Sequence, residues 1–275
     1  MMRLCLFLFF LLVSALPIGA QTIRSVLAGG HWVRIEVEQT GIYKITYAEL
    51  KKMGFADPAK VSVHGYGGWP LSEDFSQPGY KDDLPATGVY RGSDYLLFYG
   101  LGPVKWTYDS SSRTFVHTNN PYSTYGSYFL TDSTATKDMP STASADSSAA
   151  LSIHTYDEYR LYENDRFSPN ASGRELFGEA FVSGQTRTLS SSAFQIPGIT
   201  SDEGKVSMRF IACPRSISGT ATLSIDGKAL LNLSFPTVPV SDLYTKATAQ
   251  TGVAAWTGDK SETPQVSISY NGGSS

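Results

Sequence analysis

The chain has 275 residues, a net charge of −3 and only 17% charged residues, whereas glycine, tyrosine and phenylalanine are plentiful. A nucleic-acid-binding protein would need a clustered basic face, so this composition argues against nucleic acid as a partner. It also gives no reason for adhesion to an anionic lipid surface. Short apolar runs separated by frequent turn residues favour a mainly β architecture, and the length suits one large or two ordinary domains.

The N-terminus has the parts of a secretory signal peptide. Arg3 supplies a positive charge, Leu4 to Val13 contains no polar residue, and small residues precede an expected cleavage site near Ala20. The apolar run is too short to span a membrane, which takes about 20 residues. We therefore predict a signal peptide over residues 1–20, export across a membrane and no transmembrane segment. Only Cys213 would remain after cleavage, so we expect no intrachain disulfide.

The first predicted domain, residues 21–132, is a small α+β unit. Alternating residues predict strands over 32–37 and 42–45, and Thr46 with Glu49 forms the pattern of a helix capping box. This pattern predicts one short helix over about 46–53, with Gly54 at its left-handed end. Val61 and Val63 resume a strand, and the glycines that follow, Gly65, Gly67 and Gly68, predict a turn.

The rest of the first domain reads as a long loop followed by strands. Residues 69–88 are rich in Pro, Asp, Ser and Gly and predict an irregular loop. The apolar run over 94–103 predicts a strand that is buried on both faces. Residues 105–108 and 114–117 flank a polar turn and predict a hairpin, and residues 128–131 predict a further strand.

The second predicted domain, residues 151–275, reads as an antiparallel β-sandwich. A segment dominated by Ser, Thr, Ala and Asp, residues 133–150, separates it from the first and predicts a linker or surface loop. Residues 153–162 are expected to be extended. Strands are expected over residues 177–182, 206–212, 221–225, 228–235 and 266–270. The pair Asp226-Gly227 between two of these strands predicts a two-residue hairpin turn.

The residue types that could carry catalysis do not form a recognisable site. Cys213 lies within a strand pattern and precedes Pro214, and His64-Gly65 only superficially matches a cysteine-peptidase histidine. A cysteine peptidase needs a thiolate beside a histidine and an oxyanion hole. We therefore favour a buried structural role for Cys213 and a hydrogen-bonded structural role for His64, and predict no catalytic residue.

Metal and cofactor sites are also not predicted. His31, His64, His117 and His154 are scattered without metal-ligand spacing, although His154 with Asp157 and Glu158 could supply ligands. Asp82 and Asp83 could ligate calcium, but calcium needs six or more oxygens, so a solvated loop is the favoured interpretation. Arg174 with Glu175 and Glu179 could bind a carboxylate, against the favoured alternative of an ion pair that fixes a turn. The sequence leaves the roles of Arg174, Glu179, Asp82 and Asp83 open.

An alternative function is that of a surface binding module for glycan or a protein partner. Trp69, Tyr80 and Tyr90 lie in predicted loops, where an exposed ring could stack on a sugar. Aromatic residues of β proteins more often pack in the core or across strands, so this alternative ranks second.

Several stretches, taken in order, resemble one family. These are Gly41-Ile42-Tyr43-Lys44-Ile45, Tyr66-Gly67-Gly68, Leu97-Phe98-Tyr99-Gly100-x-Gly102-Pro103-x-x-Trp106, Tyr159-x-x-Tyr162-Glu163-Asn164-Asp165 and Ser172-Gly173-Arg174-Glu175-x-Phe177-Gly178-Glu179. They resemble the N-terminal region of the PorU family of type IX secretion sortases, gingipain-like cysteine peptidases of the Bacteroidota. The likeness covers most of the mature chain.

The resemblance implies a protein of the cell surface or outer membrane. Full-length members carry a C-terminal peptidase domain that removes the C-terminal sorting domain of cargo and joins the cargo to an anionic lipopolysaccharide. The present chain ends where that domain would be expected to begin, so we expect a non-catalytic scaffold and a truncated gene or fragment. The implied partners are the peptidase domain and other type IX secretion components.

Overall fold

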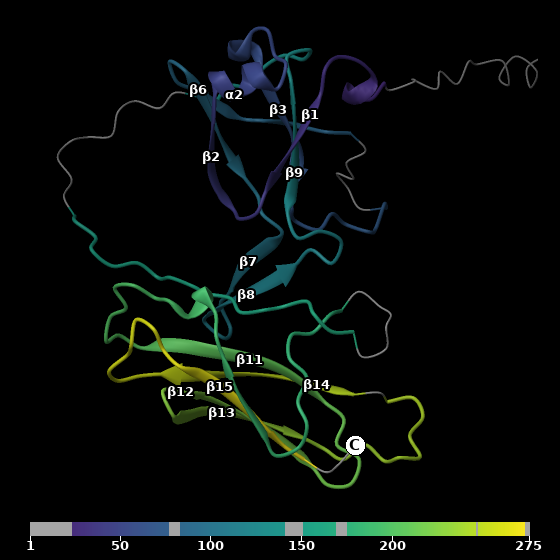
Figure 1. The fold of residues 1–275 in the computed structure, drawn as a ribbon, viewed down its shortest axis with the longest axis vertical. Helices are drawn as coiled ribbons and strands as arrows, with labels where there is room; N and C mark the ends of the chain where they lie inside the picture. The colour runs from purple at the N-terminus through teal and green to yellow at the C-terminus, as the bar shows by residue number, and fades with distance from the viewer. Residues whose placement is uncertain (1–23, 77–82, 141–150, 169–174, 246, 273–275) are drawn as a thin grey trace, which may run out of the picture. The chain divides into compact units, whose positions relative to one another are not determined.

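The computed structural model describes residues 24–76, 83–140, 151–168, 175–245 and 247–272 (Figure 1). Within these ranges the protein is mainly β, with antiparallel sheets and one short α-helix, which confirms the predicted fold class. The described residues include no helix long and apolar enough to cross a membrane. The predicted signal peptide (1–20), residues 141–150 of the predicted linker, Tyr80, Asp82 and Arg174 lie outside the described residues.

The chain divides into two compact units. The first comprises Met1–Lys105 and His117–Ser144, and the second comprises Trp106–Val116 and Ala145–Ser275. The hairpin of β7 (Val104–Asp109) and β8 (Thr114–Asn119) confirms the predicted pair of strands, and its tip groups with the second unit. The predicted domain limits at residues 132 and 151 stay a prediction.

Two antiparallel sheets build the first unit. One has the strand order β1 (Val33–Val37), β9 (Gly126–Thr131), β3 (Ser62–Gly67) and β4 (Ala86–Thr87), and the other has the order β2 (Gly41–Thr46), β6 (Tyr95–Gly100) and β5 (Val89–Arg91). The inner faces of both sheets supply one core, in which the rings of Phe98 and Tyr128 pack with centroids 5.2 Å apart. Short 3₁₀ turns lie at η1 (Val26–Ala28) and η2 (Pro58–Lys60).

The short helix forms as its capping signal predicts. Helix α2 (Tyr47–Lys52) begins after Thr46, whose hydroxyl accepts from the Glu49 backbone N–H while the Glu49 carboxylate accepts from the Thr46 N–H. The two bonds satisfy backbone donors that the first turn leaves without partners. Gly54 has a φ of +96°, the left-handed conformation expected after the helix. The buried face centres on Leu50, which is fully covered.

Two predictions for the first unit are wrong in detail. Gly65 and Gly67 do not form a turn, because β3 continues through them with a register shift against β9. Their positive φ values explain why glycine is needed there. The run over 94–103 is not buried on both faces: in β6, Leu96 and Phe98 are buried but Tyr99 is half exposed. The outer face of its three-stranded sheet has no second layer of core residues among those described.

The second unit has the arrangement of strands expected for a sandwich. One sheet has the order β10 (Gln185–Leu189), β15 (Val266–Asn271), β12 (Gly219–Ile225) and β13 (Lys228–Phe235), and β11 (Gly204–Ala212) pairs with β14 (Thr248–Trp256). A 3₁₀ turn, η3 (Ser192–Phe194), follows β10. The ring of Phe210 on β11 packs against Phe235 and Tyr270 of the larger sheet, with centroids 5.8 and 5.5 Å apart. The two sheets therefore share one apolar core.

The hairpin with the Asp-Gly turn is confirmed. Asp226 and Gly227 have φ values of +51° and +78°, the left-handed pair that a two-residue hairpin turn requires. The predicted strand over 177–182 is wrong, because only Phe177 makes a β-bridge, with Phe167. The segment from 151 to 166 is irregular, and strands β4, β5, β10 and β14 were not predicted.

Candidate functional site

An aromatic-lined pocket lies on the outer face of the β1-β9-β3-β4 sheet of the first unit. Ser127 and Phe129 of β9 point to this face, because Tyr128 and Leu130 between and after them point into the core. The cavity has a volume of about 560 Å³. It is lined by Tyr66, Gly67, Trp69, Pro70, Leu71, Ser72, Glu73, Phe75, Leu84, Asn120, Tyr122, Ser127 and Phe129.

Backbone contacts hold the loop that carries most of these side chains. The Gly68 N–H donates to the Leu101 carbonyl at 2.8 Å, and the Asn120 side-chain amide donates to the Gly68 carbonyl at 2.8 Å. A Cβ atom at Gly68 would lie 2.5 Å from the backbone of Gly102, so only glycine allows this approach. The predicted irregular loop therefore begins from a fixed point on the sheet.

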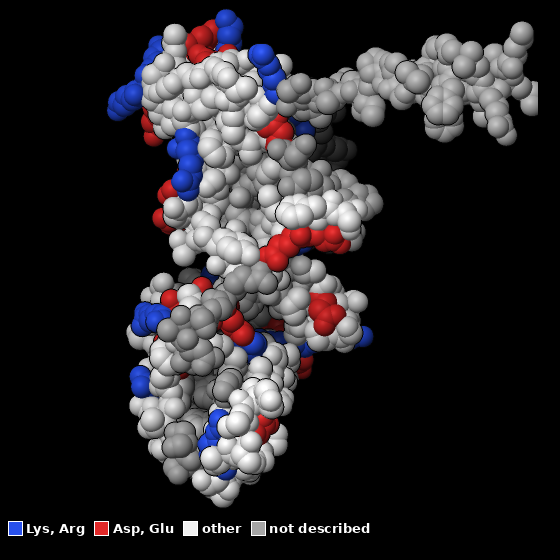
Figure 2. Space-filling model, turned by 90° about the vertical axis from the view of Figure 1, so that its right-hand side faces the viewer, with Lys and Arg blue, Asp and Glu red and all other residues white. Residues whose placement is uncertain are grey.

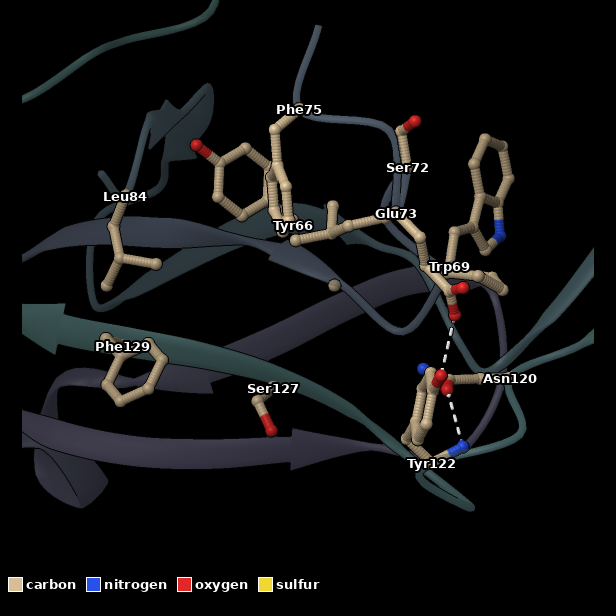
Figure 3. Close-up of a pocket in the computed structure, with 13 residues that line it drawn as sticks. Tyr66, Trp69, Ser72, Glu73, Phe75, Leu84, Asn120, Tyr122, Ser127 and Phe129 are labelled. Carbon is tan, nitrogen blue, oxygen red and sulfur yellow. Dashed lines mark hydrogen bonds between the residues drawn. The ribbon is translucent and has the colours of Figure 1, made fainter. Parts of the chain in front are cut away.

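An acidic and an aromatic side chain meet at one end of the pocket, as Figure 3 shows. The Tyr122 hydroxyl donates to the Glu73 carboxylate at 2.6 Å, and the Tyr122 backbone N–H donates to the Asn120 side-chain oxygen at 2.9 Å. Tyr122 and Phe75 keep about two-thirds of their side chains exposed. The lining thus combines ring faces with a carboxylate and an amide, the residue types with which proteins stack on and orient polar ligands.

Trp69 contributes an indole N–H that has no acceptor. Its Nε1 atom is buried and finds no hydrogen-bond partner among the described residues. The Lys105 ammonium lies 5.2 Å from the centre of the indole ring, within the range of a cation–π contact. Because Nε1 is buried, a ligand in the pocket would meet the faces of the aromatic rings rather than this N–H.

His64 belongs to a buried polar cluster beneath the same face. Its Nε2 atom lies 2.8 Å from the Thr134 hydroxyl and 3.2 Å from the Ser62 hydroxyl, and Ser62 also donates to the Thr131 carbonyl. The Ser62–His64 pair has the residue types of a nucleophile and base. His64 is 4% and Ser62 1% exposed, so a substrate would not reach either of them as they stand.

Asp83 ties the start of the described chain to the loop beside His64. Its carboxylate accepts from the Val26 backbone N–H at 2.8 Å and from the Ser25 hydroxyl at 2.9 Å. The bond from Val26 is the main reason that the pKa of Asp83 lies below its usual value. The Tyr66 hydroxyl donates to the Asp83 carbonyl. The Asp83 carboxylate therefore already accepts hydrogen bonds from Ser25 and Val26.

The remaining sequence candidates lie apart from the pocket. Cys213 follows the last residue of β11 and is partly exposed, rather than buried within a strand as predicted. No cluster of three or more His, Cys, Asp or Glu side chains suited to a metal ion occurs within the described ranges. Tyr90 lies on β5 and is half exposed, and it does not line the pocket.

The two glutamates of the predicted arginine cluster have other partners. Glu175 forms an ion pair with Arg209 of β11, in which both side chains are about half exposed. The Tyr162 hydroxyl donates to Glu179, and burial, followed by this bond, raises the pKa of Tyr162. Neither contact involves Arg174, which lies outside the described residues, so the ion pair predicted for this cluster stays a prediction.

Charges of both signs lie on the face of the molecule drawn in Figure 2, where Lys and Arg are interspersed with Asp and Glu between broad uncharged areas.

Comparisons with known proteins identify one relationship. No family model matches the chain, and no curated protein matches it. Among solved structures, the chain is similar to the crystal structure of dimeric latent PorU from Porphyromonas gingivalis, with 35% sequence identity and a TM-score of 0.74. The match covers 90% of this chain and 23% of the PorU chain. The similarity supports a PorU-like relationship for this protein, over a region that corresponds to about a quarter of PorU.

Proposed function

We propose that this chain is the non-catalytic N-terminal scaffold of a PorU-like type IX secretion sortase, exported to the cell surface or outer membrane. In this proposal the peptidase domain of the full-length protein removes the C-terminal sorting domains of cargo and attaches the cargo to anionic lipopolysaccharide. The two units described here fold beside that domain and present it. Other type IX secretion components are further partners.

The observation that carries the proposal is the 35% identity to PorU over 90% of this chain but only 23% of PorU. Such a match fits one region of a longer protein. The chemistry of the chain supports the same conclusion. Cys213 is partly exposed after the end of β11, but no glycine-rich loop adjoins it to donate hydrogen bonds to an oxyanion. The Ser62–His64 pair is buried. A cysteine peptidase would need an accessible thiolate–histidine pair.

Two experiments test this proposal: determination of the full reading frame, and analysis of cargo processing in mutant strains. We expect the reading frame that contains this chain to encode a gingipain-like peptidase domain. Deleting residues 21–275 in frame should abolish the shortening of secreted cargo, whereas Cys213→Ala should leave it unchanged. Unrelated sequence beside the chain, or cargo that is shortened normally by the deletion strain, would contradict the scaffold role. Loss of processing in the Cys213→Ala strain would assign the chemistry to this chain instead.

A second candidate function is glycan binding in the aromatic-lined pocket. The observation that favours it is a cavity whose lining combines the rings of Trp69, Phe75 and Tyr122 with a carboxylate and an amide. Sugar rings stack on aromatic faces while their hydroxyls accept and donate hydrogen bonds. The pocket size suits a short oligosaccharide, because ligand pockets commonly measure about 300–1,000 Å³.

Affinity electrophoresis against a panel of polysaccharides, followed by calorimetry, tests this second function. Trp69→Ala should lower the affinity at least tenfold, since it removes one of the aromatic rings that line the cavity. Tyr90→Ala is the matched control, because Tyr90 is a half-exposed aromatic residue that lies outside the pocket. Absence of retardation across the panel, or equal losses in the two variants, would rule the pocket out as a glycan site.

A further inference from the structure

An exposed apolar tip projects from one end of the second unit. The loop between β13 and β14 exposes 75% of Val240 and 94% of Tyr244, and Leu243 beside them is 74% exposed. The loop between β11 and β12 adds Ile217, which is 62% exposed. We name Ile217, Val240, Leu243 and Tyr244 the apolar tip. Grouped exposure of large apolar side chains on a folded surface marks an interaction site more often than chance exposure does.

The two loops of the apolar tip are bound to each other at their base. The Val238 N–H donates to the Pro214 carbonyl at 2.8 Å, and the Arg215 guanidinium donates to the Pro239 carbonyl at 3.1 Å. Val238 is 4% exposed and the side chain of Pro214 is fully buried. The exposed residues therefore stand on a packed base and do not belong to a loop that lacks internal contacts.

Asp242 fixes the turn between the exposed residues. Its N–H donates to the Pro239 carbonyl at 2.9 Å, and its carboxylate accepts from the N–H groups of Tyr244 and Thr245, each at 2.9 Å. Hydrogen bonds from Thr245, and then from Tyr244, lower the pKa of Asp242. Ordering a loop costs conformational entropy. In this loop the ordered conformation leaves large apolar side chains exposed to water instead of burying them. A partner that covers the tip would recover that burial.

The chain leaves the sandwich at the same end as the apolar tip. Asn271, the last residue of β15, pairs with Thr220 at the start of β12, directly after the loop that carries Ile217. A Cβ atom on Gly272 would lie 3.1 Å from the Cα atom of Gly219. Any polypeptide that continues from Asn271 therefore emerges beside the apolar tip.

We propose that the apolar tip is the surface on which the domain following β15 docks in the full-length PorU-like protein. The inference rests on the proposed function, which places a peptidase domain after these two units. A domain tethered at this end has a high effective concentration at the tip, so a modest apolar contact is enough to hold it. Interfaces between domains of one chain bury about 600–1,500 Å², an area that an apolar tip of this kind can anchor.

Oxidative footprinting of tyrosines tests the docking surface. Hydroxyl radicals are applied to the full-length protein and, separately, to the 275-residue chain, and the modification rates of Tyr244 and Tyr156 are compared by mass spectrometry. Tyr156 is the internal control, because it is 81% exposed and lies in the irregular segment of the same unit. We expect Tyr244 to react at least as fast as Tyr156 in the 275-residue chain. In the full-length protein Tyr244 should react at least fivefold more slowly than Tyr156.

The outcomes separate the docking surface from the proposed function. A full-length protein that has a peptidase domain but shows the same Tyr244-to-Tyr156 ratio as the 275-residue chain would overturn the docking surface and leave the scaffold role intact. A reading frame without any following domain would overturn both. A full-length Tyr244→Ser variant adds a second readout. It should expose the linker after residue 271 to limited proteolysis several times faster than a Tyr156→Ser variant does, and equal rates would contradict the proposal.

Discussion

In the first unit some of the exposed aromatic side chains lie around a hollow, whereas the second unit carries exposed apolar side chains on the apolar tip. In the hollow, Trp69, Phe75 and Tyr122 surround a cavity of about 560 Å³ that also contains a carboxylate and an amide. On the apolar tip, Val240 and Tyr244 are 75% and 94% exposed in the loop between β13 and β14. A hollow with mixed chemistry suits a small polar ligand, and an exposed apolar surface suits a macromolecular partner.

The two units also differ in how they fix these features. The hollow depends on glycines that let two backbone segments approach, as Gly68 and Gly102 do. The tip depends on hydrogen bonds that the Asp242 carboxylate accepts from two backbone N–H groups, and on a packed proline base. The first feature is therefore sensitive to steric change, and the second to the loss of a single carboxylate.

The largest expected effect tests whether each unit has a core of its own. Phe98→Ala should destabilise the first unit by about 3–5 kcal/mol, and Phe235→Ala should do the same to the second, because each ring is completely buried. Scanning calorimetry should show one transition lowered by each variant and the other unchanged. If both variants lowered a single common transition, the units would not be independent in stability.

Glycine substitutions sharpen the comparison of the two surfaces. Gly68→Ala should cost about 1–3 kcal/mol, because its Cβ would overlap the backbone of Gly102 and displace the loop that lines the hollow. Gly227→Ala meets open space and should cost about 1–2 kcal/mol from its positive φ alone. Urea unfolding gives both values, and Trp69 fluorescence should shift only for Gly68→Ala. An unchanged emission spectrum in that variant would contradict the steric account of the hollow.

A smaller effect is expected at the only α-helix of the described residues. Thr46→Ala should destabilise the first unit by about 1 kcal/mol, because the Glu49 backbone N–H loses its acceptor at the helix start. Thr46→Ser retains the hydroxyl and is the matched control. Thermal unfolding monitored by circular dichroism checks the difference, and equal melting temperatures for the two variants would show that the cap contributes nothing.

The pH dependence of stability distinguishes the contribution of Asp83 in the first unit from that of Asp242 in the second. Hydrogen bonds, first from the Val26 N–H, lower the pKa of Asp83 in the folded state, so ionised Asp83 stabilises the fold above its unfolded pKa of about 3.9. That stability is lost as the pH falls toward the folded value. Thermal unfolding from pH 6 to pH 2.5 should therefore show a smaller decline for Asp83→Asn than for the parent chain in the first unit. Asp242→Asn should reduce the decline only in the second unit.

Much of the fold could be predicted from sequence patterns that involve only a few neighbouring residues. The capping box at Thr46 and the turn at Asp226-Gly227 specify their elements with neighbouring residues, and both are confirmed. Strand β14, by contrast, contains small and polar residues, and its positions alternate between partly buried and exposed with none fully buried. Its pairing with β11 is set by tertiary contact, which no local pattern reveals.

The strand predicted over 177–182 shows the opposite error. Its apolar residues suggest alternation, yet Phe181 packs against Phe210 while its backbone stays out of the sheets. The apolar side chains of this segment cover the core without joining a ladder. A pattern of residue types predicts burial more directly than it predicts hydrogen bonding.

The pocket could be predicted only in part. Trp69 was a candidate because it follows the glycine cluster in a loop, and it does line the cavity. Phe129 and Tyr122 were missed, because their position depends on the order of strands in the sheet and on the Asn120 contact with Gly68. The one signal available was the alternation in β9, which places Phe129 on the face opposite Tyr128.

The native length of the polypeptide tests the central claim most directly. An antibody against this chain, applied to the outer-membrane and soluble fractions of the producing bacterium, followed by mass spectrometry of the captured protein, measures it. The PorU-like scaffold account predicts an outer-membrane polypeptide several times larger than the 29.8 kDa of this chain, with peptides from a gingipain-like peptidase domain. A captured protein no larger than this chain and without such peptides would contradict it.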